Sequence, residues 1–153
     1  MKRLLATSLA VGAAVATVVW VTAVGAGASS AFTGTIHVVE HAVTDAVTNG
    51  ATEDKLGNVL TFANPVYDEA DAKQVGTDNG YCVRTVKGAA WECTWTTFLS
   101  AGQITVEGPY SDTSNTKLAI TGGTGLYANA RGWMALNYHN KQGTEYDFIF
   151  HIS

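Results

Sequence analysis

Basic residues are scarce in this chain, whose nine lysines and arginines face 13 aspartates and glutamates. Two of the nine, Lys2 and Arg3, lie at the N-terminus, so the 125 residues after Ala28 carry 7 basic and 13 acidic side chains, a net charge of −6. A protein that binds nucleic acid needs a cationic surface that contacts the phosphates. The composition therefore argues against a nucleic-acid partner.

Long uncharged runs are missing beyond the N-terminal region, and none there reaches the roughly 18 residues of a membrane-spanning helix. At the N-terminus, Lys2 and Arg3 precede an uncharged stretch from Leu4 to Val24, which leads to the small-residue cleavage motif Ala26-Gly27-Ala28. We expect residues 1–28 to be a signal peptide and residues 29–153 to form a single secreted domain with no membrane span. The alternative is a retained membrane anchor at the N-terminus.

Cysteine is also rare, with only Cys82 and Cys93 present. Export permits a disulfide, and the runs on either side of Lys87-Gly88 are rich in β-branched and aromatic residues, as strands are. A hairpin centred on Lys87-Gly88 places Cys82 opposite Cys93, close enough for a disulfide bond. The sequence predicts this disulfide, and a reactive thiol at Cys82 is the alternative.

No long helical pattern, internal repeat or low-complexity stretch follows the signal region. Apolar and polar residues alternate in several runs, so that Tyr146, Phe148 and Phe150 share one face of the last run. The pattern predicts an all-β fold, an eight-stranded antiparallel closed barrel whose interior is packed or holds one small ligand. The expected strands are Thr35–His41, Asn58–Asn64, Gly80–Val86, Trp91–Leu99, Gly102–Gly108, Lys117–Thr121, Arg131–His139 and Thr144–Ile152.

One histidine motif resembles a zinc site but lies in a segment that favours a strand. Residues His37 to His41 read H-x-x-E-H, which in one class of zinc peptidases places both histidines one turn apart on a helix. On a strand, residues four apart are separated by about 13 Å, too far to share a zinc ion with ligands at about 2 Å. We predict outward-facing histidines, no metal and no cofactor.

A glycine-rich segment from Thr121 to Ala128 imitates the G-x-G-x-x-A dinucleotide fingerprint. That fingerprint requires a helix that begins at the glycines and a parallel sheet of βαβ units. The residues after Ala128 read as strands instead. We expect a glycine turn with positive φ between the sixth and seventh strands.

Glu40 is the first candidate for a functional residue. Alternation places it on the same face as Ile36 and Val38. If that face is the inner one, burial raises the pKa of Glu40, and such groups are frequent at functional sites. Alternatively, Glu40 is solvated at the strand end or paired with Arg84 or Arg131.

Asn64 and several aromatic residues are further candidates. Asn64 shares a face with Leu60 and Phe62 at the end of its expected strand, so it either points inward or caps the turn at Pro65. Trp91 and Trp95 share the face of Cys93 and form either aromatic core or a ligand-binding wall. The residues expected to line a cavity are Phe62, Cys82, Trp91, Trp95, Tyr146 and Phe148.

Several motifs, in their order and spacing, resemble the allene oxide cyclases over roughly residues 35–153. The Gly-Gly-Thr-Gly of residues 122–125, together with Ala130-Arg131-Gly132, also resembles the dirigent proteins, which share the fold. The resemblance implies an eight-stranded antiparallel barrel with an apolar central cavity. The motifs are Gly57-Asn58-Val59-Leu60-Thr61-Phe62-Ala63-Asn64, Val75-Gly76, Gly80-Tyr81-Cys82-Val83, Gly102-Gln103-Ile104-Thr105-Val106-Glu107-Gly108-Pro109-Tyr110 and Leu118-Ala119-Ile120-Thr121-Gly122-Gly123-Thr124-Gly125.

The resemblance also implies roles for Glu40, Asn64 and Cys82. In the family, the matching glutamate stabilises the cation that forms as an epoxide opens. Asparagines hold a water on the epoxide oxygen, and the cysteine shapes the substrate for ring closure. This chain departs from the family at Ala42, where a second asparagine is expected, and in Cys93, which offers Cys82 a disulfide partner.

These observations predict a secreted barrel that cyclises or isomerises a hydrophobic small molecule, with Glu40 and Asn64 as the catalytic residues. A dirigent-like or other binding barrel that leaves its ligand unchanged is the first alternative. A fully packed structural barrel is the second. The sequence leaves open which ligand is bound and whether the chain forms a homo-oligomer.

Overall fold

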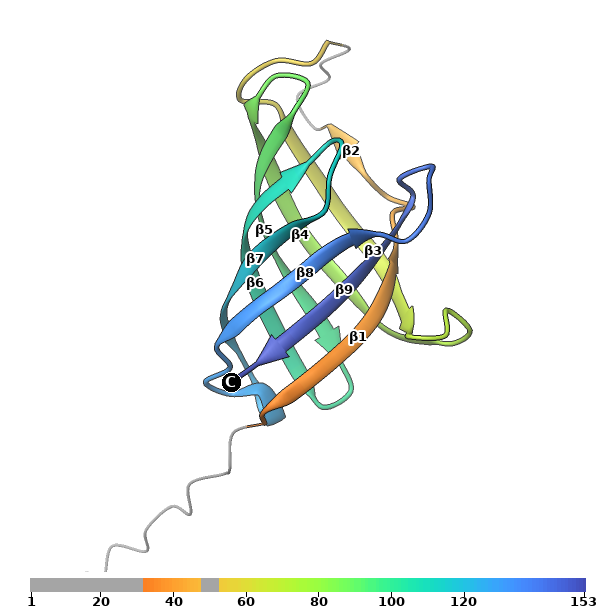
Figure 1. The fold of residues 1–153 in the computed structure, drawn as a ribbon, viewed down its shortest axis with the longest axis vertical. Helices are drawn as coiled ribbons and strands as arrows, with labels where there is room; N and C mark the ends of the chain where they lie inside the picture. The colour runs from red at the N-terminus through yellow and green to blue at the C-terminus, as the bar shows by residue number, and fades with distance from the viewer. Residues whose placement is uncertain (1–31, 48–52) are drawn as a thin grey trace, which may run out of the picture.

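The computed structural model describes residues 32–47 and 53–153, which form an antiparallel β-barrel (Figure 1). The expected signal peptide, residues 1–28, lies outside the described residues. Eight long strands build the barrel wall, and a two-residue strand, β2, and a single 3-10 turn, η1, complete the described elements. Their bounds are β1 Gly34–His41, β2 Ala46–Val47, β3 Val59–Asp68, β4 Gln74–Val86, β5 Ala90–Leu99, β6 Gly102–Ser111, β7 Thr116–Gly123, η1 Gly125–Tyr127, β8 Gly132–Tyr138 and β9 Glu145–Ile152.

The sheet closes through β1, which pairs with strands from both ends of the chain. Along its whole length β1 is antiparallel to β9, from Gly34 opposite Ile152 to His41 opposite Glu145. Its other edge pairs with β3, where Val38 to Glu40 lie opposite Asp68 to Val66. This closure leaves no long unpaired edge in the wall, and it confirms the predicted eight-stranded antiparallel barrel.

Two strands are longer than the sequence pattern predicts. We expected a strand to end at Asn64, but β3 continues through Pro65 to Asp68, and β4 begins six residues before Gly80. Proline lacks an N–H and is confined to strand positions where no hydrogen bond is lost. Pro65 fits here because it lies between the β3 residues that pair with β2 and those that pair with β1.

The hairpin of β4 and β5 carries the predicted disulfide. Cys82 lies opposite Cys93 and is bonded to it, which confirms the pairing and excludes a free thiol at either residue. The turn is not the symmetric Lys87-Gly88 turn that we expected. A register shift between Arg84 and Val86 brings Val86 opposite Ala90, so the hairpin combines a bulge with a three-residue loop.

Alternation along the strands separates a buried inner face from a solvated outer face. In β9, Tyr146, Phe148, Phe150 and Ile152 are all buried, as predicted. Apolar side chains of β6 to β9 fill the barrel toward the end that holds the C-terminus, among them Ile104, Ile120, Met134 and Phe150. Hydrophobic packing at this end stabilises the barrel.

The glycine segment after β7 forms a turn, as predicted, and not a nucleotide-binding helix. Gly125 has φ 60°, and a Cβ there would lie 2.5 Å from the carbonyl oxygen of Ala101. Within the part of the chain that the structure describes, no helix has the length and apolar character needed to cross a membrane.

Candidate functional site

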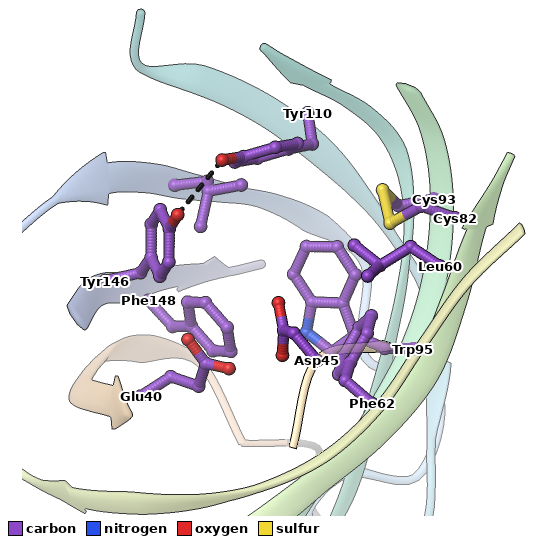
Figure 2. Close-up of a pocket in the computed structure, with 11 residues that line it drawn as sticks. Glu40, Asp45, Leu60, Phe62, Cys82, Cys93, Trp95, Tyr110, Tyr146 and Phe148 are labelled. Carbon is purple, nitrogen blue, oxygen red and sulfur yellow. Dashed lines mark hydrogen bonds between the residues drawn. A yellow bond between two sulfur atoms is a disulfide. The ribbon is translucent and has the colours of Figure 1, made fainter. Parts of the chain in front are cut away.

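A cavity opens at the end of the barrel opposite the C-terminus. It holds about 460 Å³ of space not filled by atoms, a volume that includes solvent at its mouth. Inward side chains of seven strands and Asp45, which precedes β2, line it (Figure 2). The lining residues are Glu40, Asp45, Leu60, Phe62, Cys82, Cys93, Trp95, Tyr110, Leu136, Tyr146 and Phe148.

Most of the cavity wall is apolar and aromatic. Trp95 is in ring contact with Phe62, at 6.0 Å between centroids, and with Phe148, at 5.3 Å. The chain makes room for the indole at Gly80, which lies opposite Trp95 and where a Cβ would come within 2.3 Å of the Trp95 Cβ. The indole Nε1 of Trp95 is buried without a hydrogen-bond partner among the described residues.

Glu40 is buried in this wall and is bonded to Asn64. It is 4% exposed, and its Oε1 accepts a hydrogen bond of 2.5 Å from Asn64 Nδ2. Burial is the main reason that the pKa of Glu40 lies well above its ordinary value of 4.5; the negative charges of Asp78 and Asp45 raise it further. The expected alternative pairings of Glu40 with Arg84 and Arg131 are wrong. Arg84 pairs with Asp54 and Asp112, and Arg131 donates to main-chain carbonyls.

Asn64 lies within β3 and points inward instead of capping a turn. Its Oδ1 accepts hydrogen bonds from the backbone N–H groups of Val43 and Thr44, at 3.1 and 2.9 Å, and from the Thr44 hydroxyl. Its Nδ2 donates to Glu40 and also to Asp45 Oδ1, at 2.8 Å. The amide therefore uses both of its donors and holds the segment between β1 and β2 across the mouth of the barrel.

Two more carboxylates, neither of them predicted from the sequence, complete this cluster. Asp78, 1% exposed on β4, accepts a hydrogen bond from the backbone N–H of Asn64, and its Oδ2 has no partner among the described residues. Burial raises the pKa of Asp78 from 3.8 to about 8. Asp45 is exposed as a residue, but its carboxyl group is turned into the cavity, where partial burial raises its pKa.

Alternation could have identified Asp78, because it lies four residues before Cys82 and so on the same inner face of the strand. The expected strand begins only at Gly80, so Asp78 lies outside it. No local signal marks Asp45, whose position depends on the bonds that Asn64 makes to the segment before it. Within the described residues, no ion pair joins Glu40, Asp45 or Asp78 to a lysine or arginine.

Two tyrosines of the cavity lining, Tyr110 and Tyr146, are joined through their hydroxyls (Figure 2), and Tyr146 lies opposite Glu40 in the pairing of β9 with β1. The Tyr110 hydroxyl lies 3.0 Å from that of Tyr146 and 3.3 Å from that of Tyr138. Tyr146 donates to the carbonyl of Gly143, and Tyr138 donates to that of Ser111. Burial raises the pKa of Tyr146 to about 12 and that of the other two still higher, so all three stay protonated at neutral pH.

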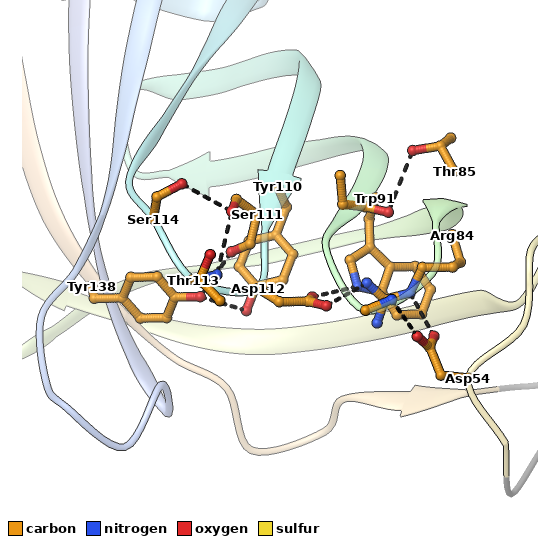
Figure 3. Close-up of polar contacts among 12 residues, drawn as sticks. Asp54, Arg84, Thr85, Trp91, Tyr110, Ser111, Asp112, Thr113, Ser114 and Tyr138 are labelled. Atoms are coloured by element: carbon orange, nitrogen blue, oxygen red, sulfur yellow. Dashed lines mark hydrogen bonds and ion pairs between the residues drawn. The ribbon is translucent and has the colours of Figure 1, made fainter.

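Trp91, which we expected in the cavity wall, lies outside the lining and near the barrel mouth instead (Figure 3). The Arg84 guanidinium lies 3.8 Å from the centre of the Trp91 ring and contacts Asp112, at 2.6 Å, and Asp54, at 2.7 Å. Trp91 Nε1 donates to the same Asp112. This partly buried ionic group ties the β4–β5 hairpin to the residues that follow β6.

The other residues expected in the cavity, Phe62, Cys82, Trp95, Tyr146 and Phe148, do line it. Glu40 contacts the cavity, whereas Asn64 lies behind it. His37 and His41 are on the outer face of β1, each bonded to a carboxylate there. The structure therefore separates the histidines of the H-x-x-E-H motif from its glutamate.

Comparison with known proteins identifies a family. A family model described as allene oxide cyclase matches residues 39–141, which is more than half of the chain. The match includes Glu40, Asn64 and Cys82, the three residues that the sequence resemblance singled out.

Solved structures of related shape have diverse activities. A pyocyanin demethylase is 24% identical with a TM-score of 0.63, over 76% of this chain and 100% of that one. A pterocarpan synthase dirigent protein is 21% identical with a TM-score of 0.65, over 78% of this chain and 88% of its own. A Diels-Alderase described as exo-specific and intermolecular is 12% identical with a TM-score of 0.61, over 78% of this chain and 96% of its own. At these identities the similarity shows the shared barrel fold.

Proposed function

The chain belongs to the allene oxide cyclase family, and on that premise we propose that it binds a hydrophobic small molecule in the cavity and closes or isomerises a ring of that molecule. One observation carries the proposal: a buried carboxyl group, Glu40, faces an open space whose walls are mostly apolar and aromatic. Catalytic carboxyl groups whose pKa is raised by apolar surroundings keep a proton at neutral pH that they can transfer to a ligand.

In this proposal the cavity shapes the ligand and the carboxylates supply the charge. Aromatic walls fold a flexible apolar chain toward the geometry of ring closure and exclude water. Protonated Glu40 gives its proton to the oxygen of a strained C–O bond as that bond breaks, and the Glu40 carboxylate takes a proton back from the ligand once the ring has closed. Negative charge remaining on the cluster then stabilises the carbocation that forms.

Asn64 acts as a positioning residue in this scheme. The resemblance implies that asparagines hold a water on the substrate oxygen, but both Nδ2 donors of Asn64 are taken by Glu40 and Asp45. Ala42 stands where the family has its second asparagine. We therefore assign the donor role toward the substrate oxygen to Glu40, which lines the cavity.

Export remains part of the proposal. The disulfide between Cys82 and Cys93 suits an oxidising compartment, and the N-terminal sequence has the features of a signal peptide. A dirigent-like barrel, which binds a ligand without converting it, is the alternative function. Both functions require a ligand in the cavity, so binding alone does not distinguish them. Conversion of the ligand does, because only the cyclase or isomerase converts it.

The first test is binding in the cavity. N-phenyl-1-naphthylamine, a neutral apolar dye, should bind to the full chain with one site and become fluorescent. Leu60→Trp fills the cavity from β3 and should weaken binding at least tenfold, about 1.4 kcal/mol. Leu56→Trp is the matched control, since Leu56 is 68% exposed and does not line the cavity. Absent binding, or equal binding by both variants, would refute a ligand-binding cavity.

A further inference from the structure

A cluster of histidines and carboxylates lies on the outer wall of the barrel, away from the cavity. Its side chains come from β1, from β9, and from the connections between β3 and β4 and between β8 and β9. They converge because β1 pairs with both β3 and β9. The cluster consists of His37, His41, Asp71, His139, Glu145 and Asp147.

Three of these side chains present ligand atoms to a common point. One oxygen of Asp71, one of Glu145 and one ring nitrogen of His139 all lie within 4.8 Å of one another. Ligands at about 2.1 Å from a zinc ion are separated by at most about 4.2 Å. His139 is exposed, and the two acidic residues are only partly buried, so small rotations bring the three groups to that distance.

Hydrogen bonds within the cluster hold two of these groups in place. Asp147 Oδ1 is bonded to His139 Nδ1, at 2.8 Å, which leaves Nε2 as the nitrogen available to an ion. A histidine that binds a metal typically has its other ring nitrogen held by a carboxylate in this way. Asp71 is held similarly, because its Oδ1 contacts His41 Nε2, at 2.7 Å.

The local charge favours a cation. Asp71 and Asp147 form their ion pairs with histidines, and within the described residues neither is paired with a lysine or arginine. Imidazole nitrogen combined with carboxylate oxygen is a donor set that zinc and related divalent transition metals accept. We propose that Asp71, His139 and Glu145 form a binding site for such a cation, with Asp147 orienting His139. The bound ion would link the β3–β4 and β8–β9 connections.

This site is independent of the proposed function, because none of its residues lines the cavity. The H-x-x-E-H motif predicted no metal site, and its histidines His37 and His41 are not the ligands proposed here. The proposed ligands are distant in sequence and only the barrel closure assembles them. Competing zinc donors are few, since the chain has four histidines and both of its cysteines are in the disulfide.

Isothermal titration of the full chain with zinc chloride, after dialysis against EDTA, tests the site. We expect one saturable site and a rise in melting temperature on zinc addition. His139→Ala should weaken binding at least tenfold and abolish the rise, and Asp147→Asn should weaken it about 10- to 100-fold. His151→Ala is the control, because His151 also faces outward from β9 but stacks on Trp133.

Two results would overturn the proposal: no saturable binding by the parent chain, or equal affinity in the parent and His139→Ala. Glu145→Gln provides a second variant should His139→Ala fail to fold, and it should also weaken binding at least tenfold. Unchanged affinity in a folded Glu145→Gln would equally count against the site.

Discussion

The side chain of Asn64 connects the segment across the barrel mouth to the carboxylates beneath it. Its carbonyl holds the backbone of Val43 and Thr44, and its amino group holds Glu40 and Asp45. A network of buried hydrogen bonds is strongly coupled, since each lost partner leaves others unsatisfied. Asn64 therefore sets both the shape of the mouth and the position of the candidate acid.

Asn64→Ala should lower the free energy of unfolding by about 3 kcal/mol, because it leaves buried groups without partners. The local effect is more specific. The amide protons of Val43 and Thr44 should exchange faster with solvent, whereas that of Ala42, which donates to the Thr144 carbonyl, should not. Hydrogen exchange measured by NMR gives both values, and unchanged protection at Val43 and Thr44 would contradict the assigned role.

At the scale of single residues, the alternation of side chains predicted that Glu40 shares a face with Ile36 and Val38. The prediction holds because β1 stays extended as far as His41. The sequence leaves Asn64 open between an inward position and a turn cap, since Pro65 predicts a turn directly after it. Asp45 could not be predicted, because its carboxyl group is placed by hydrogen bonds across the barrel rather than by its neighbours in sequence.

Among the elements, the β4–β5 hairpin combines a disulfide with a bulge. The bulge at Thr85 and the loop Lys87–Ala89 together preserve the pairing of Cys82 with Cys93. The midpoint between the two cysteines predicted the pairing. The bulge adds one residue to β4 and the loop has three residues instead of two, so the two changes cancel and Cys82 still lies opposite Cys93. The midpoint could not predict the bulge, which leaves the register at the cysteines unchanged.

The disulfide should stabilise the fold. A closed loop of this length contributes on the order of 3 kcal/mol in the chain-entropy model. The double variant Cys82→Ala with Cys93→Ala should therefore have a free energy of unfolding lower by that amount, measured by urea unfolding. The native protein should contain no thiol that reacts with iodoacetamide when reductant is absent. A double variant as stable as the parent would show that packing alone holds the hairpin.

The whole barrel is packed at one end and open at the other, and the open end contains charge. Glu40, Asp45 and Asp78 meet there without a neutralising lysine or arginine among the described residues. Ionising all three would be costly in apolar surroundings. The folded protein therefore holds protons at neutral pH that the unfolded chain releases.

Stability should consequently fall as pH rises. The pKa of Asp78 is 3.8 ordinarily and about 8 in the fold, so the folded state binds the extra proton between these values. Each such proton lowers the free energy of unfolding by up to about 1.4 kcal/mol per pH unit in that window. Asp78→Asn should flatten the decline, whereas Glu107→Gln, on the exposed outer face, should not. Urea unfolding at pH 5, 6.5 and 8 measures the free energy of unfolding of the parent chain and of both variants. A parent chain that is most stable at pH 8 would contradict a raised pKa for Asp78.

The barrel could be predicted from the sequence because several of the long strands alternate between apolar and polar residues, and eight such strands have few ways to bury their apolar faces. The open cavity could not be predicted from the sequence. Whether Trp95 and Phe148 fill the interior or leave space depends on their rotamers and on Gly80 opposite, which no periodicity records. The same limit applies to Trp91, which shares a face with Trp95 but packs on Arg84.

The conversion rate of a hydrophobic epoxide by the parent chain and by Glu40→Gln tests the central claim most directly. Glutamine keeps the size of Glu40 and can still accept the hydrogen bond from Asn64, but it cannot ionise or give up a proton. We predict that the variant binds the naphthylamine dye within about twofold of the parent, is at least as stable at pH 7, and converts the epoxide at least 100-fold more slowly. Equal conversion by both proteins, or a less stable variant with no conversion by either, would contradict the account.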